Sequence, residues 1–455
     1  MTGSTQNGLK EKLLTFRHGV HPEEYKELSN HQRIERMPFV EEYTLPLLQH
    51  IGAPSKPLVH KGQRVRRGDL IAEAGSYVSV ALHAPVDGTV TDIGLYGHPN
   101  GQMLPAIKIR TDPFSTQQLD QPAQRQPEEL AKAEFIEAIQ RAGIVGLGGA
   151  AFPAHVKFNL SQNQPCRYLM LNGCECEPFL TCDHRVMVEY AEELIDGAHI
   201  LQHFIQAEKV YIAIEANKPD AVVGLRAAAA KAGFPVEIIP LQVKYPQGAE
   251  KMMISAILGK EVPAGRLPID VGVLVSNVGS IVALSQYFRH SQPLIERVIT
   301  VTGPAVRRPA NVLVPLGTPM RDLVEFCGGI TGEAARILLG GPMMGIVQKS
   351  LDTPVVKGTS GILVLTEREV QDIDTFSCIR CGRCLEACPL FLNPARLGLL
   401  ARKGLWDDME DINALDCFEC GACSYVCPSA IPLVQSIKVG KSMIREKKAR
   451  EKNQA

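Results

Sequence analysis

The chain has 455 residues, 45% of them hydrophobic and 21% charged, with 48 Lys plus Arg against 49 Asp plus Glu. These values are those of an ordinary soluble protein, and the length corresponds to about three domains of ~150 residues each. A net charge of -1 provides no overall basic field for nucleic acid. No apolar stretch reaches the ~20 residues of a membrane helix, and residues 1–14 lack the apolar core of a signal peptide. We therefore expect a cytoplasmic chain without nucleic-acid partners that reaches a membrane only through other proteins.

The first predicted elements are short strands between Tyr43 and Arg110. Two similar halves, around residues 65–70 and 84–90, contain Gly- and Pro-rich turns, and turns about every 8 to 12 residues are typical of a small β-sandwich. The segment resembles a biotinyl/lipoyl-type barrel-sandwich, although Tyr77 stands where those domains carry the modified Lys. We interpret it as a structural or docking module. A Pro- and Gln-rich linker follows it.

From Leu130 onward, helical and extended patterns alternate along the chain. The patterns predict helices at 131–140, 185–204, 220–231 and 248–258, and strands at 168–171, 210–215 and 236–240. This alternation predicts a parallel α/β sheet. Beyond it, two strands and one helix predict a small α+β insert, at 298–303, 310–315 and 320–327.

Eight of the thirteen cysteines lie between residues 378 and 427. In a cytoplasmic chain such cysteines indicate metal binding or catalysis rather than disulfides. They form C-x2-C-x2-C-x3-C-P twice, the pattern of two [4Fe–4S] clusters in which each fourth Cys ligates the other cluster. One cluster is assigned to Cys378, Cys381, Cys384 and Cys427, and the other to Cys417, Cys420, Cys423 and Cys388.

We expect each fourth Cys to open a helix that leads to the neighbouring cluster. Two zinc sites are the alternative, but zinc does not require a fourth Cys followed by Pro in both motifs. Clusters carry single electrons and perform no bond chemistry by themselves, so the chain needs an electron source and an electron acceptor.

A glycine-rich loop at residues 146–153 (G-L-G-G-A-A-F-P) satisfies G-x-G-x-x-A. It follows a predicted helix rather than a strand, which argues against a Rossmann dinucleotide site. Its N–H groups can still approach an anionic or planar ligand, and Lys157 adds a cation; a simple turn is the alternative. Further on, Glu175 and Glu177 follow a predicted strand, at the edge where a parallel sheet faces its ligands. A solvated acidic loop is the alternative there.

Four motifs, in this order, resemble the flavin- and NADH-binding subunit of respiratory complex I. Residues 146–157 are similar to its G-R-G-G-A-G-F-P-T-G-L-K, 172–178 to N-A-D-E-x-E-P, 245–250 to Y-x-x-G-E-E, and 275–278 to V-N-N-V. That protein of complex I has one cluster with a different Cys pattern. With its sandwich and its two-cluster tail, the whole chain resembles the C-subunit family of the Rnf ion-translocating electron transport complexes.

The resemblance implies a multidomain α/β chain with seven parts. They are an N-terminal extension (1–42), the barrel-sandwich (43–111), a linker (112–129), a parallel α/β domain for FMN and NADH (130–295), a soluble-ligand-binding β-grasp insert (296–366), a helical two-cluster ferredoxin-like domain (367–437) and a basic tail (438–455).

The resemblance also implies the cofactor-binding residues. FMN would be bound noncovalently by Gly146, Gly148, Gly149, Lys157, Asn172, Glu175, Gly248, Ser276 and Asn277. Glu177 and Glu250 would act in catalysis by positioning the nicotinamide half of NADH, and Phe152 would stack on its adenine. The chain departs from the complex I pattern at Leu147, Ala151, Leu160, Ala249 and Ser276.

The expected function is electron input to a membrane-bound, ion-translocating NADH/ferredoxin oxidoreductase. NADH gives up two electrons as a hydride and a cluster accepts one, so a flavin is needed between them. The chain would lie at the cytoplasmic face of the inner membrane, held by membrane and ferredoxin-like subunits. The rival hypothesis is a cluster-only relay adaptor whose α/β domain binds no nucleotide. A flavoenzyme acting on a small substrate is disfavoured, because no His or Ser nucleophile constellation is present.

The last 18 residues carry seven Lys or Arg and two Glu, a balance of +5. They either contact anionic lipid or an acidic partner, or form a solvated helix end.

Overall fold

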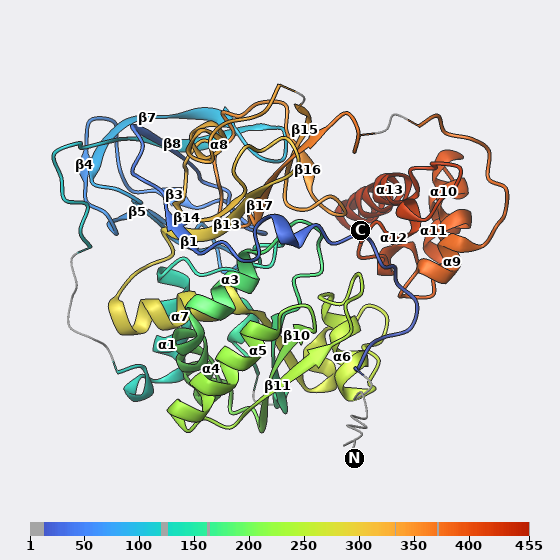
Figure 1. The fold of residues 1–455 in the computed structure, drawn as a ribbon, viewed down its shortest axis with the longest axis horizontal. Coiled ribbons are helices and arrows are strands. Elements are labelled where there is room, and N and C mark those ends of the chain that lie inside the picture. The colour runs from blue at the N-terminus through green and yellow to red at the C-terminus, as the bar shows by residue number, and fades with distance from the viewer. Residues whose placement is uncertain (1–12, 120–125, 162–163, 333, 371–372, 455) are drawn as a thin grey trace, which may run out of the picture.

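A computed structural model describes residues 13–119, 126–161, 164–332, 334–370 and 373–454. The expectations for the first 12 residues and for linker residues 120–125 fall outside the described residues. Three β-containing parts lie against one another, and a helical part lies at one side of them (Figure 1).

The N-terminal part contains the predicted barrel-sandwich. One antiparallel sheet has the order β2 (Glu42–Pro46), β8 (Met103–Thr111), β7 (Gly88–Gly97), β4 (Arg64–Val65), and the other β3 (Lys56–Pro57), β5 (Leu70–Glu73), β6 (Leu82–His83). Alternating residues such as Tyr43, Leu45, Ile107 and Ile109 point inward and are fully buried. Tyr77 is exposed at its surface.

The central part confirms the predicted parallel sheet. Its order is β11 (Val236–Leu241), β10 (Lys209–Glu215), β9 (Tyr168–Gly173), β12 (Val273–Asn277). The helices around it are α1 (Lys132–Arg141), α2 (Ala154–Phe158), α3 (Cys182–Glu189), α4 (Ala191–Ile205), α5 (Pro219–Ala232), α6 (Glu250–Leu258) and α7 (Val278–His290).

The single helix predicted at 185–204 is wrong, because the chain forms two helices there. Tyr190 leaves the helical conformation between α3 and α4 (φ -118°, ψ 36°). The second helix then packs closely on α7, where a Cβ at Gly197 would lie 2.2 Å from the Ile281 carbonyl oxygen. Only glycine permits this approach.

The third part is a six-stranded sheet that includes the predicted insert. Its order is β1 (Ile34–Arg36), β14 (Ala310–Pro315), β13 (Glu296–Thr302), β17 (Gly361–Thr366), β15 (Ala334–Leu339), β16 (Ile346–Val347), with α8 (Met320–Phe326) beside it. Strand β1 belongs to the N-terminal extension and pairs in parallel with β14. This long-range pairing was not predicted.

The C-terminal part consists of α9 (Arg383–Ala387), α10 (Pro394–Arg402), α11 (Trp406–Asp411), α12 (Ala422–Tyr425) and α13 (Leu433–Gln454). The expected basic tail is the continuation of α13, and Lys447 and Lys448 form ion pairs with Asp407 and Glu410. Short 3-10 turns occur at Lys26–Leu28, Pro127–Glu129, Pro268–Val271 and Ala414–Asp416. In the described part of the chain, no helix has the length and apolar character that crossing a membrane requires.

Candidate functional site

The glycine-rich loop connects α1 to α2 and is fixed at its base. Gly146 N donates to Phe152 O and Leu147 N donates to Ser280 Oγ, both at 2.8 Å. At its tip Gly148 and Gly149 are exposed, and within the described residues their N–H groups donate to no protein acceptor. Gly149 has φ 108° and open space where a Cβ would stand. The loop is thus a cradle of free donors suited to an anionic or planar ligand.

Asn277 lies below this loop, at the junction of β12 and α7. Its Oδ1 accepts from Gly279 N at 2.9 Å, and its Nδ2 donates to Asp183 Oδ2 at 2.7 Å. A Cβ at Gly148 would lie 3.5 Å from it. The neighbouring Ser276 is buried. Two predicted segments far apart in sequence therefore meet here.

The segment of residues 172–178, called the acidic elbow below, ends β9 and continues past it at the same edge of the sheet. Asn172 Nδ2 donates to Gly248 O at 2.8 Å and so joins two predicted motifs. Glu175 accepts from the N–H groups of Asp183 (2.7 Å) and His184 (3.2 Å) and caps the start of α3. Burial, and then the charge of Glu175, raise the pKa of Asp183 to about 7.

Glu177 lies beneath the loop of residues 340–345, between β15 and β16. Its Oε2 accepts from Met343 N at 3.0 Å, while its Oε1 is buried without a partner among the described residues. A Cβ at Gly341 would lie 2.2 Å from Oε2. Burial raises the pKa of Glu177 to about 7. This residue therefore contacts the β-grasp insert, whereas the resemblance places it at NADH.

Lys157 of α2 and Glu250 of α6 form an ion pair, in which the side chains are 32% and 40% exposed. Phe152, in the glycine-rich loop, is partly buried. The structure thus brings the predicted cation and one predicted nucleotide carboxylate into direct contact.

Two buried lysines that the sequence analysis missed hold the elbow. Lys26 Nζ donates to the carbonyl oxygens of Glu175 (2.7 Å), Glu177 (3.0 Å) and Leu180 (2.6 Å). Lys218 Nζ donates to Cys174 O at 2.8 Å. Lys218 follows the carboxyl end of β10, so the edge rule that identified Glu175 also reaches Lys218. No sequence signal marked Lys26.

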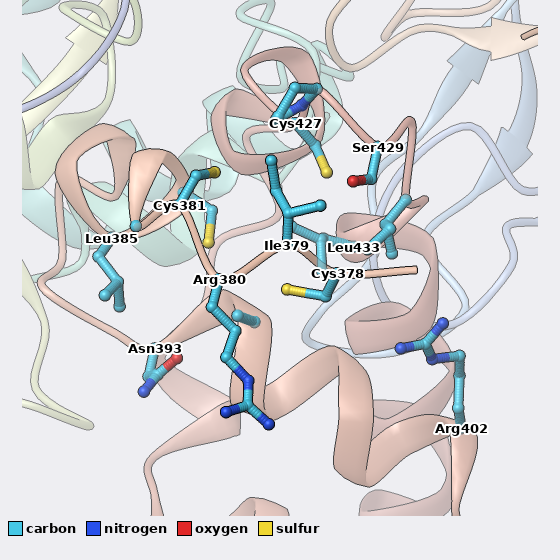
Figure 2. Close-up of a pocket in the computed structure, with 15 residues that line it drawn as sticks. Cys378, Ile379, Arg380, Cys381, Leu385, Asn393, Arg402, Cys427, Ser429 and Leu433 are labelled. Carbon is cyan, nitrogen blue, oxygen red and sulfur yellow. The ribbon is translucent and has the colours of Figure 1, made fainter. Parts of the chain in front are cut away.

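The eight motif cysteines form two groups. The first group lines one cavity of about 240 Å³ and consists of Cys378, Cys381, Cys384 and Cys427 (Figure 2). The second is Cys417, Cys420, Cys423 and Cys388, where burial and then the charges of the other three raise the pKa of Cys423 to about 12. Each group joins three cysteines of one motif to the fourth of the other.

The spacing of these thiols fits a cluster better than a single zinc ion. Zinc bound by sulfurs at about 2.3 Å requires them about 3.8 Å apart. Among the described residues, neither thiol group brings three ligand atoms within 4.8 Å of one another. The expectation that each fourth Cys opens a helix is wrong, because Cys388 directly follows α9 and Cys427 lies after α12.

The second thiol group lies against the elbow, whereas the first faces outward. Tyr245 Oη donates to Cys420 O at 2.6 Å, and Tyr245 packs in one apolar cluster with Cys176 and Cys420. A Cβ at Gly421 would lie 2.9 Å from Met343 O. In the first group, Cys378 and Cys381 are exposed.

Four known protein families match successive parts of the chain. The RnfC barrel sandwich hybrid domain matches residues 14–113, the Nuo51 FMN-binding domain 139–286, the SLBB domain 298–347 and the 4Fe-4S dicluster domain 374–431.

Two relatives are similar over most of their lengths. The C subunit of a proton-translocating ferredoxin:NAD(+) oxidoreductase complex from Clostridium ljungdahlii is 44% identical, over 87% of this chain and 86% of the relative. The C subunit of a Na(+)-translocating ferredoxin:NAD(+) oxidoreductase complex from Acetobacterium woodii is 38% identical, over 94% and 97%. Among solved structures, an H2-reduced NAD+-reducing [NiFe]-hydrogenase has a similar fold (TM-score 0.50, 20% identity), over 70% of this chain and 63% of that one.

Proposed function

The chain belongs to the family of C subunits of ion-translocating oxidoreductase complexes, and from this premise we propose that it carries electrons between NAD(H) and other subunits of such a complex. It does so through FMN and two [4Fe–4S] clusters. The contact that carries this proposal is made by Tyr245, which packs with Cys176 of the elbow and donates a hydrogen bond to Cys420 O of the second thiol group.

FMN is held between the glycine loop and the elbow. Gly146, Gly148 and Gly149 present the backbone, Lys157 supplies the positive charge, and the remaining contacts come from Asn172, Glu175, Gly248, Ser276 and Asn277. The free N–H groups of the loop tip support this assignment. When bound, FMN accepts a hydride and releases electrons singly.

Nicotinamide nucleotide binds at the mouth of the cradle. Glu250 orients the nicotinamide half, and Phe152 stacks on the adenine. Binding requires Lys157 and Glu250 to exchange at least part of their ion pair for contacts with the two ligands. Glu177 supports this geometry from beneath the loop 340–345.

The two clusters have different places in the electron path. The cluster that Cys417, Cys420, Cys423 and Cys388 would hold is the one on the flavin side, because Cys420 contacts Tyr245 and packs in one apolar cluster with Cys176 of the elbow. The cluster that Cys378, Cys381, Cys384 and Cys427 would hold is the one on the partner side, because Cys378 and Cys381 are exposed.

Membership of this family also leads us to propose where the chain lies in the complex. The chain is a peripheral subunit at the cytoplasmic face of the inner membrane, bound by membrane and ferredoxin-like subunits. The domain limits are 43–111, 130–295, 296–366 and 367–437, with the basic segment from residue 438 completing the last domain through α13.

Anaerobic titration with NADH tests this function. The purified full chain should show a flavin spectrum, about eight iron per chain, and stepwise reduction of flavin and clusters by optical and EPR detection. Lys157→Ala should lower flavin occupancy at least tenfold while the iron content stays unchanged. If the protein retains both clusters, binds no flavin and is not reduced by NADH, the relay-adaptor hypothesis is correct instead.

A further inference from the structure

Two carboxyl groups lie close together beside the cradle. Oxygen atoms of Glu175 and Asp183 are within 4.8 Å of each other. Asp183 Oδ2 accepts from Asn277 Nδ2 at 2.7 Å, and among the described residues its Oδ1 has no hydrogen-bond donor. Two carboxylates this close repel each other, so the pair holds a proton more readily than a single carboxylate does.

The protonation of Asp183 is set by groups from several elements. The charged and titratable groups that face it are Glu175 of the elbow, Cys182 before it in α3, Lys218 after β10 and Arg297 of β13. Burial, and then the charge of Glu175, raise the pKa of Asp183 to about 7, and the Asn277 hydrogen bond and the two cations oppose this increase. The thiol of Cys182 stays protonated, because burial raises its pKa well above its ordinary value. Asp183 therefore changes its protonation near neutral pH.

A cavity of about 40 Å³ adjoins Asp183, where α3, α7 and β13 meet. The half-buried side chains of Tyr190 and Gln286 line it, and so does the buried carboxylate of Glu296. Glu296 is paired with Arg36, whose side chain is 50% exposed. A water molecule needs roughly 10–15 Å³ of such space and a few polar partners. The cavity thus has room for a short chain of water molecules between Asp183 and the surface.

The proposed reaction leaves one proton in the flavin site for every NADH that is oxidised. NADH gives up two electrons and one proton together, as a hydride. Each cluster accepts one electron and no proton. One NADH and two oxidised clusters therefore yield NAD+, two reduced clusters and one proton. That proton must reach solvent, and it must enter from solvent when the reaction runs in reverse.

We propose that Asp183 takes up this proton and passes it through the cavity beside Glu296 to solvent. The inference rests on the proposed function and adds a proton route to it. Asp183 is half-buried and lies next to Asn277, one of the expected FMN contacts. A proton acceptor in this position can act directly or through one water molecule. Asn277 orients the carboxyl group, and the cavity connects it to the surface.

A second polar path begins at the same elbow and makes a different prediction. His184 follows Asp183 in α3, and its Nε2 lies 2.7 Å from Asp220 Oδ1. The Asp220 side chain is 45% exposed. If the proton leaves by this path, loss of the Asp220 carboxylate slows its release, and a narrower cavity has no effect.

The test uses the full chain loaded with FMN and both clusters, mixed anaerobically with NADH in weak buffer that contains a pH-indicator dye. Stopped-flow absorbance follows flavin reduction, cluster reduction and proton release from about pH 5.5 to about pH 8.5. Asp183→Asn removes the proton acceptor and keeps an oxygen for the Asn277 hydrogen bond. Ala283→Val narrows the cavity, which Ala283 lines, without a change of charge. Asp220→Asn is the control for the second path.

Wild-type protein should release one proton per NADH, more slowly below about pH 7, because protonated Asp183 accepts no proton. In Asp183→Asn, proton release and transfer of the second electron should slow at least about tenfold and lose this pH dependence. Its flavin content and the reduction of its flavin by NADH should stay within about twofold of wild type. Ala283→Val should slow the same step, and Asp220→Asn should not.

Infrared difference spectra of the same proteins without NADH provide a readout that needs no turnover. A protonated-carboxyl band should appear in wild type and Ala283→Val as pH falls through about 7, and it should be absent from Asp183→Asn. Wild-type proton release in Asp183→Asn or in Ala283→Val would overturn the proposal, as would an equally slow release in Asp220→Asn. Failure of NADH to reduce the wild-type flavin contradicts the proposed function separately, because the infrared band does not depend on NADH.

Discussion

Lys441 brings a buried positive charge to the second thiol group. It is 4% exposed, and its Nζ donates to Cys417 O and to Glu419. Lys438 approaches the same carboxylate at 3.8 Å, but its side chain is 47% exposed. Two lysines on one helix face thus differ mainly in burial, and burial determines how strongly a charge acts on its neighbours.

Lys441→Gln should lower the midpoint potential of the cluster bound by Cys417, Cys420 and Cys423. Reduction adds negative charge, and a nearby buried cation stabilises that charge by about 1–2 kcal/mol. Potentiometric EPR titration measures the shift. Lys438→Gln is the matched control and should shift the potential much less, because solvent screens its charge. Equal shifts in the two variants would refute the role of burial.

The stability of the folded chain depends on pH through Glu177. Its pKa is about 7 in the folded chain, against 4.5 for an ordinary Glu. The folded state therefore binds the proton more tightly, and this residue's contribution to stability falls as pH rises from about 4.5 to about 7.

Glu177→Gln keeps the side chain neutral at every pH, so its melting temperature should exceed that of wild type by a margin that grows across this window. The gain in the free energy of unfolding at pH 8 should be about 3 kcal/mol. Differential scanning fluorimetry at pH 5 and pH 8 measures it. If the melting temperatures of the variant and the wild type differ by the same amount at pH 5 and at pH 8, Glu177 is ionised at both pH values.

At the scale of elements, the N-terminal segment connects parts that are distant in sequence. Val20 forms a β-bridge with Tyr245, and Gly19 N donates to Ala387 O at 3.3 Å. The short helix that begins at Lys26 then reaches the elbow, and β1 joins the six-stranded sheet. The segment passes between the helical part and the rest of the chain (Figure 1). It therefore orients the elbow and the second thiol group relative to each other.

Lys26→Met should destabilise this junction. Three carbonyl oxygens lose a charged donor in a buried place, at a cost of roughly 3 kcal/mol or more. We expect a lower melting temperature and weaker FMN retention, measured by fluorimetry and by flavin release on dilution. Lys56→Met, at an exposed lysine in the sandwich, is the control. Unchanged flavin retention in Lys26→Met would mean that the elbow keeps its conformation without the three hydrogen bonds from Lys26.

At the scale of the whole molecule, the β-grasp insert binds the other parts together. Lys357 Nζ donates to Ala81 O (2.9 Å) in the sandwich and to Gly143 O (2.6 Å) beside the glycine loop. Arg297 donates to Leu147 O at 3.2 Å. Burial lowers the pKa of Lys357 to about 7. The cradle is thus supported by a part of the chain that supplies none of its expected ligands.

The order of the two clusters follows from this architecture and can be tested by removing one cluster at a time. Cys388→Ser should damage the cluster near the elbow, and NADH should then reduce the outward cluster at least about a hundredfold more slowly, while dithionite still reduces it. Cys427→Ser should damage the outward cluster and leave NADH reduction of the inner one intact. Rapid-freeze EPR after NADH addition distinguishes the two. The reverse pattern would invert the proposed order.

Features that depend on local spacing along the chain could be predicted from the sequence. The repeated Cys motif predicted which cysteines belong to each group, because three ligands two residues apart must lie on one turn. The alternation of helices and strands predicted the parallel sheet, and the edge rule placed Glu175 and Glu177 after the carboxyl end of a strand.

Contacts made across long sequence separations could not be predicted and became visible in the folded chain. Glu177 accepts a hydrogen bond from Met343 N in the loop 340–345, and the backbone of the elbow accepts hydrogen bonds from Lys26. The second thiol group faces the elbow through Tyr245. Buried polar groups must find partners wherever the fold brings them, and no local pattern encodes those partners. The direction in which each cluster faces was therefore set by packing between the parts of the chain.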